Sequence, residues 1–378
     1  HSEVQIPVGV SEEVSVLPKA VGNFRAKLLE LTVHGGYTLS HDPDLGTRVF
    51  REDLNPAEAL FETVRSLIRG VEPTIHDVEP LIHPVEPGRD DLHEFLIFTI
   101  LGSAFMLVGI LALFFSTGTF DMTELPDAIQ ASTLVLPSGL IFALLFIGFA
   151  VKLPVWPLHT WLPDAHTDAP TAASIMLAGV LIKMGGYGMI RVSAAMLPGV
   201  ITDVAWLLAA AGAMNVLYGA VVTMRQTDLK RLIAFSSVSH MGFVLLGLSS
   251  VVGVGGVVSS VGLTGAALHM FTHGTITGLL FLLVGLTYEK AHTRYIPDLG
   301  GLATRVPFLA SAILVAGLAS LGLPATSGFV SEITVFLGTF PVWSWLTAVS
   351  ALGLVLTAGY ILWMFQRTLF GPEIPRFR

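Results

Sequence analysis

Six ionisable side chains lie inside long apolar stretches of this sequence, where a charge is costly. They are lysines, histidines and one glutamate: Lys152, Lys183, His240, His269, His273 and Glu332. A charged side chain at the centre of a bilayer costs roughly 3 kcal/mol on insertion scales, and such residues usually mark ion or proton paths. Histidine exchanges protons near neutral pH, and burial lowers the pKa of a lysine and raises that of a glutamate towards the same range. These residue types therefore predict a water-linked path for protons.

Simpler roles stay open for single members of this set. Lys152 or Lys183 could instead be an ion-pair partner or extend to the membrane interface. His269 precedes His273 by one helical turn and could equally be a hydrogen-bonded packing residue. Glu332 is the strongest candidate, because it follows a helix-breaking stretch.

Four further polar residues receive local interpretations. Lys230 and Arg231, in QTDLKRL, favour an anchor at the membrane interface over a place in the path. Asp164 and His166 follow a run of prolines and are interpreted as helix caps. The sequence contains no phosphate-binding loop, no HExxH zinc motif and no GxSxG nucleophile motif. These common signatures of soluble enzymes are therefore absent from it.

Membrane helices are the elements that must carry these residues. Hydrophobic residues make up 53% of the 378, charged residues 13%, and the mean hydropathy is +0.73. Apolar runs of roughly 20 residues, enough to cross a bilayer, recur from His93 onward. The predicted fold is all-α, a polytopic membrane helical bundle. Its expected spans are 93–115, 136–163, 170–191, 203–224, 230–249, 257–286, 306–339 and 342–368.

Two of these spans contain helix breakers beside an ionisable residue. Pro154 and Pro157 follow Lys152, and Pro324 precedes Glu332. Proline removes a helix hydrogen bond, and in a membrane the freed backbone groups must be satisfied by protein or water. Two such breaks in corresponding places are typical of transporters built from inverted repeats. We therefore expect two discontinuous helices in a partial inverted repeat.

Basic residues set the expected orientation. Alternating the spans places nearly all of them on one side, which should be cytoplasmic, and leaves only Arg191 on the other. The residues on the first side are Arg225, Lys230, Arg231, Lys290, Arg294, Arg305 and Arg367.

Residues 1–91 differ from the rest, because they hold 8 Lys and Arg against 16 Asp and Glu. They contain one expected amphipathic helix, at 55–70, and then a proline-rich connector. His76 and His83 in that connector are interpreted as part of a solvated spacer, so no metal site is predicted in the chain. We expect two regions, an acidic non-membrane segment at 1–91 and a membrane domain at 92–372. Cysteine is absent, and no basic patch suggests nucleic-acid binding.

Four stretches resemble the antiporter-like subunits of respiratory complex I. Among these subunits, they resemble most the chain M type, also called NADH dehydrogenase subunit 4. They are FAVKLPVWPLHTWLPDAHTDAPTAAS, QTDLKRLIAFSSVSHMGFVLLG, HMFTHGTITGLLFLLVGLTYEKAHTR and GLPATSGFVSEITVFLGTF. The resemblance covers about residues 92–372. It implies that Lys152 is the broken-helix lysine and Lys183 the central lysine. His240 and His273 are then the connecting histidines, and Glu332 is the exit-side glutamate.

The same resemblance implies a proton-translocating subunit of NADH:quinone oxidoreductase in a bacterial or archaeal cell (inner) membrane. It implies no cofactor in this chain, with NADH, FMN, iron–sulfur clusters and quinone bound by partner subunits. The expected partners are the other membrane and peripheral subunits and the lipid bilayer. Two alternatives stay open: a subunit of a cation/proton antiporter or membrane-bound hydrogenase, and a membrane scaffold that does not pump.

The chain departs from that family at both ends. About five helices normally precede HEFLIFTILG, and the last of them bears a glutamate that pairs with the broken-helix lysine. Residues 1–91 hold no such span. At least one further helix normally follows FGP. The first half-channel is therefore expected to lack its acidic partner.

Overall fold

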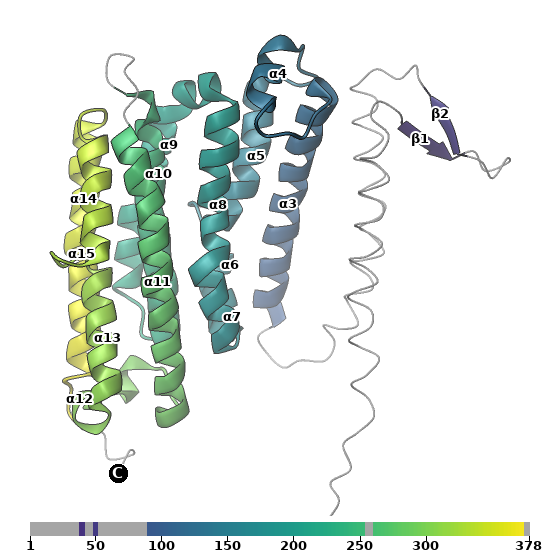
Figure 1. Ribbon diagram of the computed structural model, residues 1–378. Helices are drawn as coiled ribbons and strands as arrows, with labels where there is room; N and C mark the ends of the chain where they lie inside the picture. Colours follow the sequence, from purple (N-terminus) through teal and green to yellow (C-terminus); the bar gives the residue numbers. More distant parts are fainter. Residues whose placement is uncertain (1–37, 42–47, 52–88, 254–259, 374–378) are drawn as a thin grey trace, which may run out of the picture. The chain divides into compact units, whose positions relative to one another are not determined.

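The computed structural model describes residues 38–41, 48–51, 89–253 and 260–373 (Figure 1). Most of these residues are helical. Contacts divide the described part of the chain into two compact units. One contains the two short strands and residues 111–137, and the other contains residues 89–110, 138–253 and 260–373.

The first unit holds a small antiparallel pair and a short helix. Strand β1 (Thr38–His41) pairs with β2 (Arg48–Arg51). Helix α4 (Leu125–Ala131) was not expected from the sequence. The helix expected at 55–70 and the proline-rich connector lie outside the described residues. Helix α3 (Arg89–Thr117) begins just before the expected boundary at 91/92, so the division of the chain there stays a prediction.

An N-terminal deletion tests that division. Removing residues 1–88 leaves α3 whole, and the apolar spans after it are long enough to insert without help. We expect the shortened chain to integrate into membranes at the level of the full chain, measured as carbonate-resistant protein. A deletion that also removes α3 is the control for a lost span. Loss of integration on removing 1–88 alone would contradict the two-region division.

Beyond residues 89–110 of α3, helices make up nearly all of the second unit's secondary structure. They are α5 (Ser138–Lys152), α6 (Trp161–Asp168), α7 (Thr171–Met176), η3 (Leu177–Leu181), α8 (Ile182–Gly188), η4 (Met189–Ala194), α9 (Pro198–Thr223), α10 (Leu229–Ser249), η5 (Ser250–Val252), α11 (Ser260–Ala291), η6 (Ile296–Asp298), α12 (Leu302–Arg305), α13 (Pro307–Ser320), α14 (Ser327–Thr339) and α15 (Ser344–Thr368). The segments α7, η3, α8 and η4 follow one another without a gap and carry the expected span 170–191.

Helix α10 is the core of this unit, and it lies against α9, α11 and α14 (Figure 1). Small residues explain how α9 and α10 come so close. A Cβ on Gly212 would meet the backbone of α10, and one on Gly242 would meet the backbone of α9. The hydroxyl of Ser239 donates across the pair to the carbonyl of Val216 at 2.8 Å. Close backbone approach and cross-helix hydrogen bonds are what hold helices together where apolar burial drives little association.

The two expected interruptions lie where the helix breakers stand. Helix α5 ends at Lys152, and α6 begins only at Trp161. Helix α13 ends at Ser320, and α14 begins at Ser327. Each interruption leaves a short apolar helix before it, which by itself is too short for a full membrane crossing.

By length and composition, six helical segments of the described chain can cross a membrane. They are Glu94–Thr117, Thr171–Ala194, Pro198–Thr223, Leu229–Val252, Ser260–Ala291 and Ser344–Thr368. Most bounds lie close to the expected ones. Helix α9 starts at Pro198 rather than at 203, because proline is well accepted in the first turn of a helix. The all-α membrane bundle predicted from the sequence is thus confirmed.

Candidate functional site

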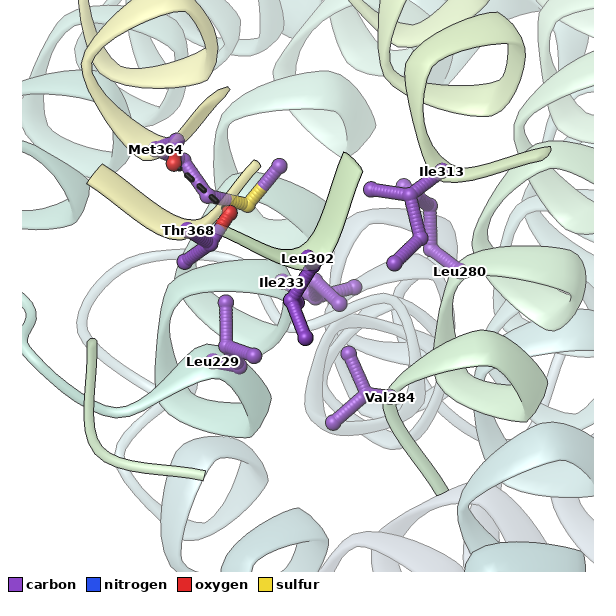
Figure 2. Close-up of a pocket in the computed structure, with 8 residues that line it drawn as sticks. All are labelled: Leu229, Ile233, Leu280, Val284, Leu302, Ile313, Met364 and Thr368. Carbon is purple, nitrogen blue, oxygen red and sulfur yellow. Dashed lines mark hydrogen bonds between the residues drawn. The ribbon is translucent and has the colours of Figure 1, made fainter. Parts of the chain in front are cut away.

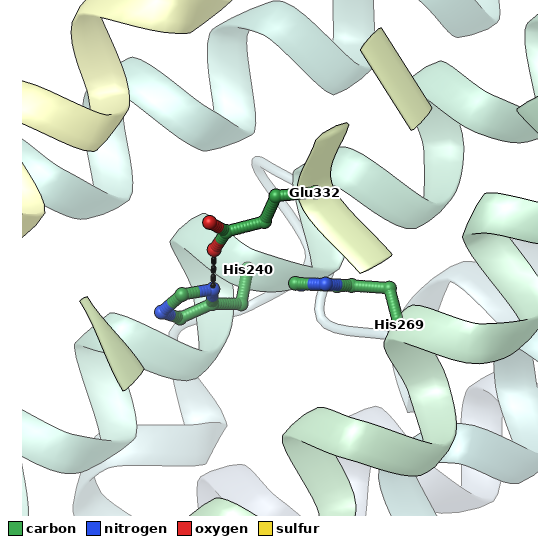
Figure 3. A group of neighbouring side chains, drawn as sticks. All are labelled: His240, His269 and Glu332. Atoms are coloured by element: carbon green, nitrogen blue, oxygen red, sulfur yellow. Dashed lines mark ion pairs between the residues drawn. The ribbon is translucent and has the colours of Figure 1, made fainter. Parts of the chain in front are cut away.

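Four of the predicted residues converge at the centre of the second unit. His240 comes from α10, His269 and His273 come from α11, and Glu332 comes from α14; all four are at most 3% exposed. The Nδ1 atom of His240 lies 3.6 Å from Oε1 of Glu332 (Figure 3). The ring of His240 is 5.4 Å from that of His269 and 5.1 Å from that of His273. The cluster therefore joins three helices around one buried carboxylate.

The second interruption positions the carboxylate of Glu332. Gly322 has φ +73°, a left-handed conformation that glycine adopts without strain. A Cβ on Gly322 would also collide with Oε2 of Glu332, so glycine leaves the space that the carboxylate occupies. One carboxylate oxygen thus faces His240, and the other faces the break between α13 and α14.

Two hydroxyls that the sequence did not single out hold His269 in place. Nδ1 of His269 lies 2.9 Å from Oγ of Ser331. The hydroxyl of Ser331 also donates to the carbonyl of Gly328 at 2.8 Å. Oγ1 of Thr272 lies 3.1 Å from the same oxygen. Ser331 therefore holds the Nδ1 side of the His269 ring, and Nε2 has no hydrogen-bond partner among the described residues.

Lys183 lies in the first turn of α8, directly after the widened segment η3 and beside α11. Segment η3 has the i→i−5 hydrogen bonds of a π-helix, a local widening that often accompanies functional sites. The ammonium group of Lys183 donates to the carbonyl of Ala178 within this turn. A Cβ on Gly274 would lie 3.5 Å from Cε of Lys183, and Gly274 directly follows His273. The half-buried lysine therefore lies next to the histidine-bearing part of α11.

A small cavity lined by both polar and apolar residues adjoins the cluster. Its volume is about 10 Å³, roughly what one water molecule needs. It is lined by His240, His269, Thr272, His273, Ile276, Ala319, Ser320, Gly328 and Glu332. Among the described residues, Oε1 of Glu332 and both ring nitrogens of His240 and His273 have no hydrogen-bond partner. Buried polar atoms of this kind normally bind water or an ion, so a proton could pass between these groups through water.

A second cavity of similar volume has a different character (Figure 2). Its lining is almost wholly aliphatic: Leu229, Ile233, Leu280, Val284, Leu302, Ile313, Met364 and Thr368. Its one hydroxyl, that of Thr368, donates to the carbonyl of Met364 at 2.8 Å, so the cavity belongs to the apolar core.

Lys152 lies apart from this cluster. It is the last residue of α5 and is half-buried, and no contact among the described residues joins it to His240 or Glu332. The sequence analysis missed the residue that holds the break after it, Asn215 of α9. Oδ1 of Asn215 accepts from the backbone N–H of Trp156 at 2.7 Å, and Nδ2 donates to the carbonyl of Pro154 at 3.2 Å. A buried amide thus satisfies backbone groups that the proline-rich break frees.

A separate polar network closes the end of α6. Nζ of Lys230 donates to the carbonyl of Ala169 at 2.6 Å, and Nη1 of Arg294 donates to that of Thr167 at 2.8 Å. Nε of Arg294 also binds Asp228 at 2.6 Å, and Asp228 caps α10. Cations at a helix C-terminus stabilise its exposed carbonyls. Lys230 is 7% exposed and caps the end of α6, and its interpretation as an anchor at the membrane interface stays a prediction.

The local caps expected after the first break take other roles. Asp164 pairs with Arg231 at 2.8 Å and so links α6 to α10. His166 is fully buried, and its ring stacks on Phe281 of α11 at 4.4 Å. The sequence could not show whether Asp164 and His166 cap a helix or contact another one, because their distances to α10 and α11 are set only by the fold.

Known proteins share both the sequence pattern and the fold of this bundle. Residues 93–358 match the family described as NADH:quinone oxidoreductase/Mrp antiporter, TM. The chain belongs to this family. The resemblance to antiporter-like subunits of complex I, drawn from the sequence motifs, is thereby confirmed. As a member of the NADH:quinone oxidoreductase/Mrp antiporter family, the chain is a multi-pass protein of the inner (cell) membrane.

Relatives in this family carry consistent names. NADH-quinone oxidoreductase subunit M of Rhodobacter capsulatus is 41% identical over 288 residues, which are 74% of this chain and 55% of the relative. NAD(P)H-quinone oxidoreductase chain 4 1 of Synechococcus elongatus is 46% identical over 286 residues, 74% of this chain and 52% of the relative. The chain therefore spans about half the length of the curated relatives it matches.

Solved structures of the family have the same fold. A chain of respiratory complex I from Thermus thermophilus, determined with bound NADH, is 27% identical with a TM-score of 0.70, and the match covers 94% of this chain and 85% of that one. A chain of the Mrp complex from Dietzia sp. DQ12-45-1b is 19% identical with a TM-score of 0.68, and the match covers 96% of this chain and 75% of that one.

Proposed function

We propose that this chain is a proton-translocating membrane subunit of an NADH:quinone oxidoreductase. One observation carries the proposal: a carboxylate, Glu332, lies 3.6 Å from His240 in a fully buried cluster with two further histidines. A buried carboxylate beside imidazoles, with room for about one water, is suited to passing protons rather than to binding a substrate. The names of the relatives point to the same enzyme class.

The proposed route crosses the unit from helix to helix. Lys152 at the first interruption and Lys183 of α8 receive protons. His273 lies next to Lys183 and faces His240, so protons pass along α11 to α10. Glu332 at the second interruption is the last acceptor, because one of its oxygens faces His240 and the other faces the break.

Redox chemistry is assigned to partner subunits. The chain has no cysteine to hold an iron–sulfur cluster, so we propose that NADH, FMN, the clusters and quinone are bound by other membrane and peripheral subunits. The alternative of a cation/proton antiporter subunit rests on the similarity to the Mrp complex. Relatives that are 41% and 46% identical carry quinone-oxidoreductase names, whereas the Mrp chain is 19% identical, which favours the first assignment.

Histidine substitutions test the proposal. His240→Ala removes the side chain between His273 and Glu332, and we expect it to slow proton pumping only in part, because the nearby cavity admits water that can bridge the gap. The double variant with His273→Ala should lose most of the pumping. Pumping is measured as NADH-driven acidification of inverted vesicles that hold the assembled complex, relative to NADH oxidation.

The matched control is His159→Ala, which removes a buried histidine that contacts Tyr218 rather than the cluster. It should leave the ratio of protons pumped to NADH oxidised unchanged. Wild-type pumping in the assembled double variant would assign both histidines to packing. It would also remove the proposed route.

A further inference from the structure

Three side chains of the buried cluster could hold a metal ion together. His240, His269 and Glu332 each offer one ligand atom, and these atoms lie within 4.8 Å of one another (Figure 3). Imidazole nitrogens and a carboxylate oxygen are the ligand types that bind zinc, and two histidines with one glutamate form a known ligand set for an open zinc site. His269 has no part in the proposed proton route, so its place in this triad calls for a separate explanation.

The hydrogen bonding of His269 leaves one ring nitrogen for a metal ion. Its Nδ1 atom lies 2.9 Å from Oγ of Ser331, so Nε2 is the nitrogen that can bind the ion. Histidines that bind metals typically donate their other N–H to a second polar group in this way. Nε2 of His269 has no hydrogen-bond partner among the described residues. The same is true of both ring nitrogens of His240 and of Oε1 of Glu332.

The geometry also leaves a position for a fourth ligand. The adjoining cavity of about 10 Å³ has room for one water beside these three residues. Ligand atoms about a tetrahedral zinc ion lie about 3.3 Å apart, as bonds of about 2.0 Å require. Side-chain movements on the order of 1 Å therefore close the triad on an ion, a change that rotamer adjustment can supply.

We propose that His240, His269 and Glu332 bind a Zn²⁺ ion, with water as the fourth ligand. The ion is a ligand that blocks this site rather than a cofactor of the reaction. Bound Zn²⁺ holds Glu332 and His240 together and prevents either from passing a proton. This inhibition rests on the proposed function, whereas the binding itself does not depend on it.

Direct binding is measured on the full chain in lipid nanodiscs, stripped of metals with a chelator. Titration with ZnCl₂ in a calorimeter should give one site. Zinc X-ray absorption should then report only nitrogen and oxygen neighbours at about 2.0 Å, as expected for a site without thiolate ligands. His269→Ala should weaken binding more than about 100-fold, since it removes a ligand rather than an outer-shell partner.

The matched control is His166→Ala, which removes another fully buried histidine. Its ring contacts Phe281, and its nitrogens have no hydrogen-bond partner among the described residues. It should bind Zn²⁺ as the wild type does. Equal affinity in the wild type and His269→Ala, or no single site in the folded wild type, would overturn the proposal. Zinc binding that is lost in His269→Ala would uphold the proposed site. If zinc then leaves proton pumping by the wild type unchanged, that result would count against the proton route and not against the site.

Discussion

Replacing Glu332 with glutamine is expected to abolish proton pumping. Glutamine keeps the size of the side chain and can still hydrogen-bond, but it cannot take up and release a proton. Glu332 is 2% exposed and lies between His240 and the break at Gly322. No other carboxylate of the described chain lies within the buried cluster that could replace it. The ratio of protons pumped to NADH oxidised should fall to less than about a tenth of the wild-type value.

Glu332→Asp is the conservative counterpart. It retains a carboxylate but withdraws it by about one methylene, so we expect part of the pumping to persist with water filling the gap. Assembly of the complex is checked by native gel and by NADH oxidation in detergent. Pumping at the native ratio in vesicles with assembled Glu332→Gln would make Glu332 a structural partner of His240 and would remove the last step of the proposed route.

Lys183→Met is expected to have an effect of similar size. Methionine approximates the apolar stem of lysine but removes the ammonium group that donates to Ala178. Because Lys183 is the proposed donor to His273, the histidine cluster should then no longer receive protons from the first half of the unit. We expect the pumping ratio to fall about tenfold or more, the scale of removing a positioned proton donor.

Lys290→Met provides the charge-matched control for that change. Lys290 is exposed near the end of α11, outside the cluster, so losing its charge should alter pumping little. Both variants are compared in the same vesicle assay after equalising the amount of assembled complex. If Lys183→Met pumps at the level of Lys290→Met, Lys183 serves only to complete the hydrogen bonds of η3.

The fold class and the helix interruptions could be predicted from local sequence. Apolar runs of span length identify the membrane helices because the bilayer imposes a minimum length on each crossing. Prolines mark the interruptions because they cannot continue a helix, as at Pro154 and Pro324. The short α4 was missed, since its seven residues carry no span-length signal.

Individual residue types were enough to nominate Lys183, His240, His273 and Glu332, because an ionisable group in an apolar run is costly wherever it lies. The free-energy cost of burying these groups does not predict that the four side chains lie close together. His240 and Glu332 are far apart in the sequence, and their 3.6 Å approach depends on how α10, α11 and α14 pack against one another.

The sequence by itself therefore determined a membrane bundle with two interrupted helices and a set of costly buried groups. Tertiary structure alone decided which of those groups meet. It brought Ser331 to His269, Asn215 to the break after Lys152, and Lys230 to the end of α6. The reason is physical: span length and helix breaking are properties of neighbouring residues, whereas a hydrogen-bond partner on another helix is fixed by packing that involves the whole unit.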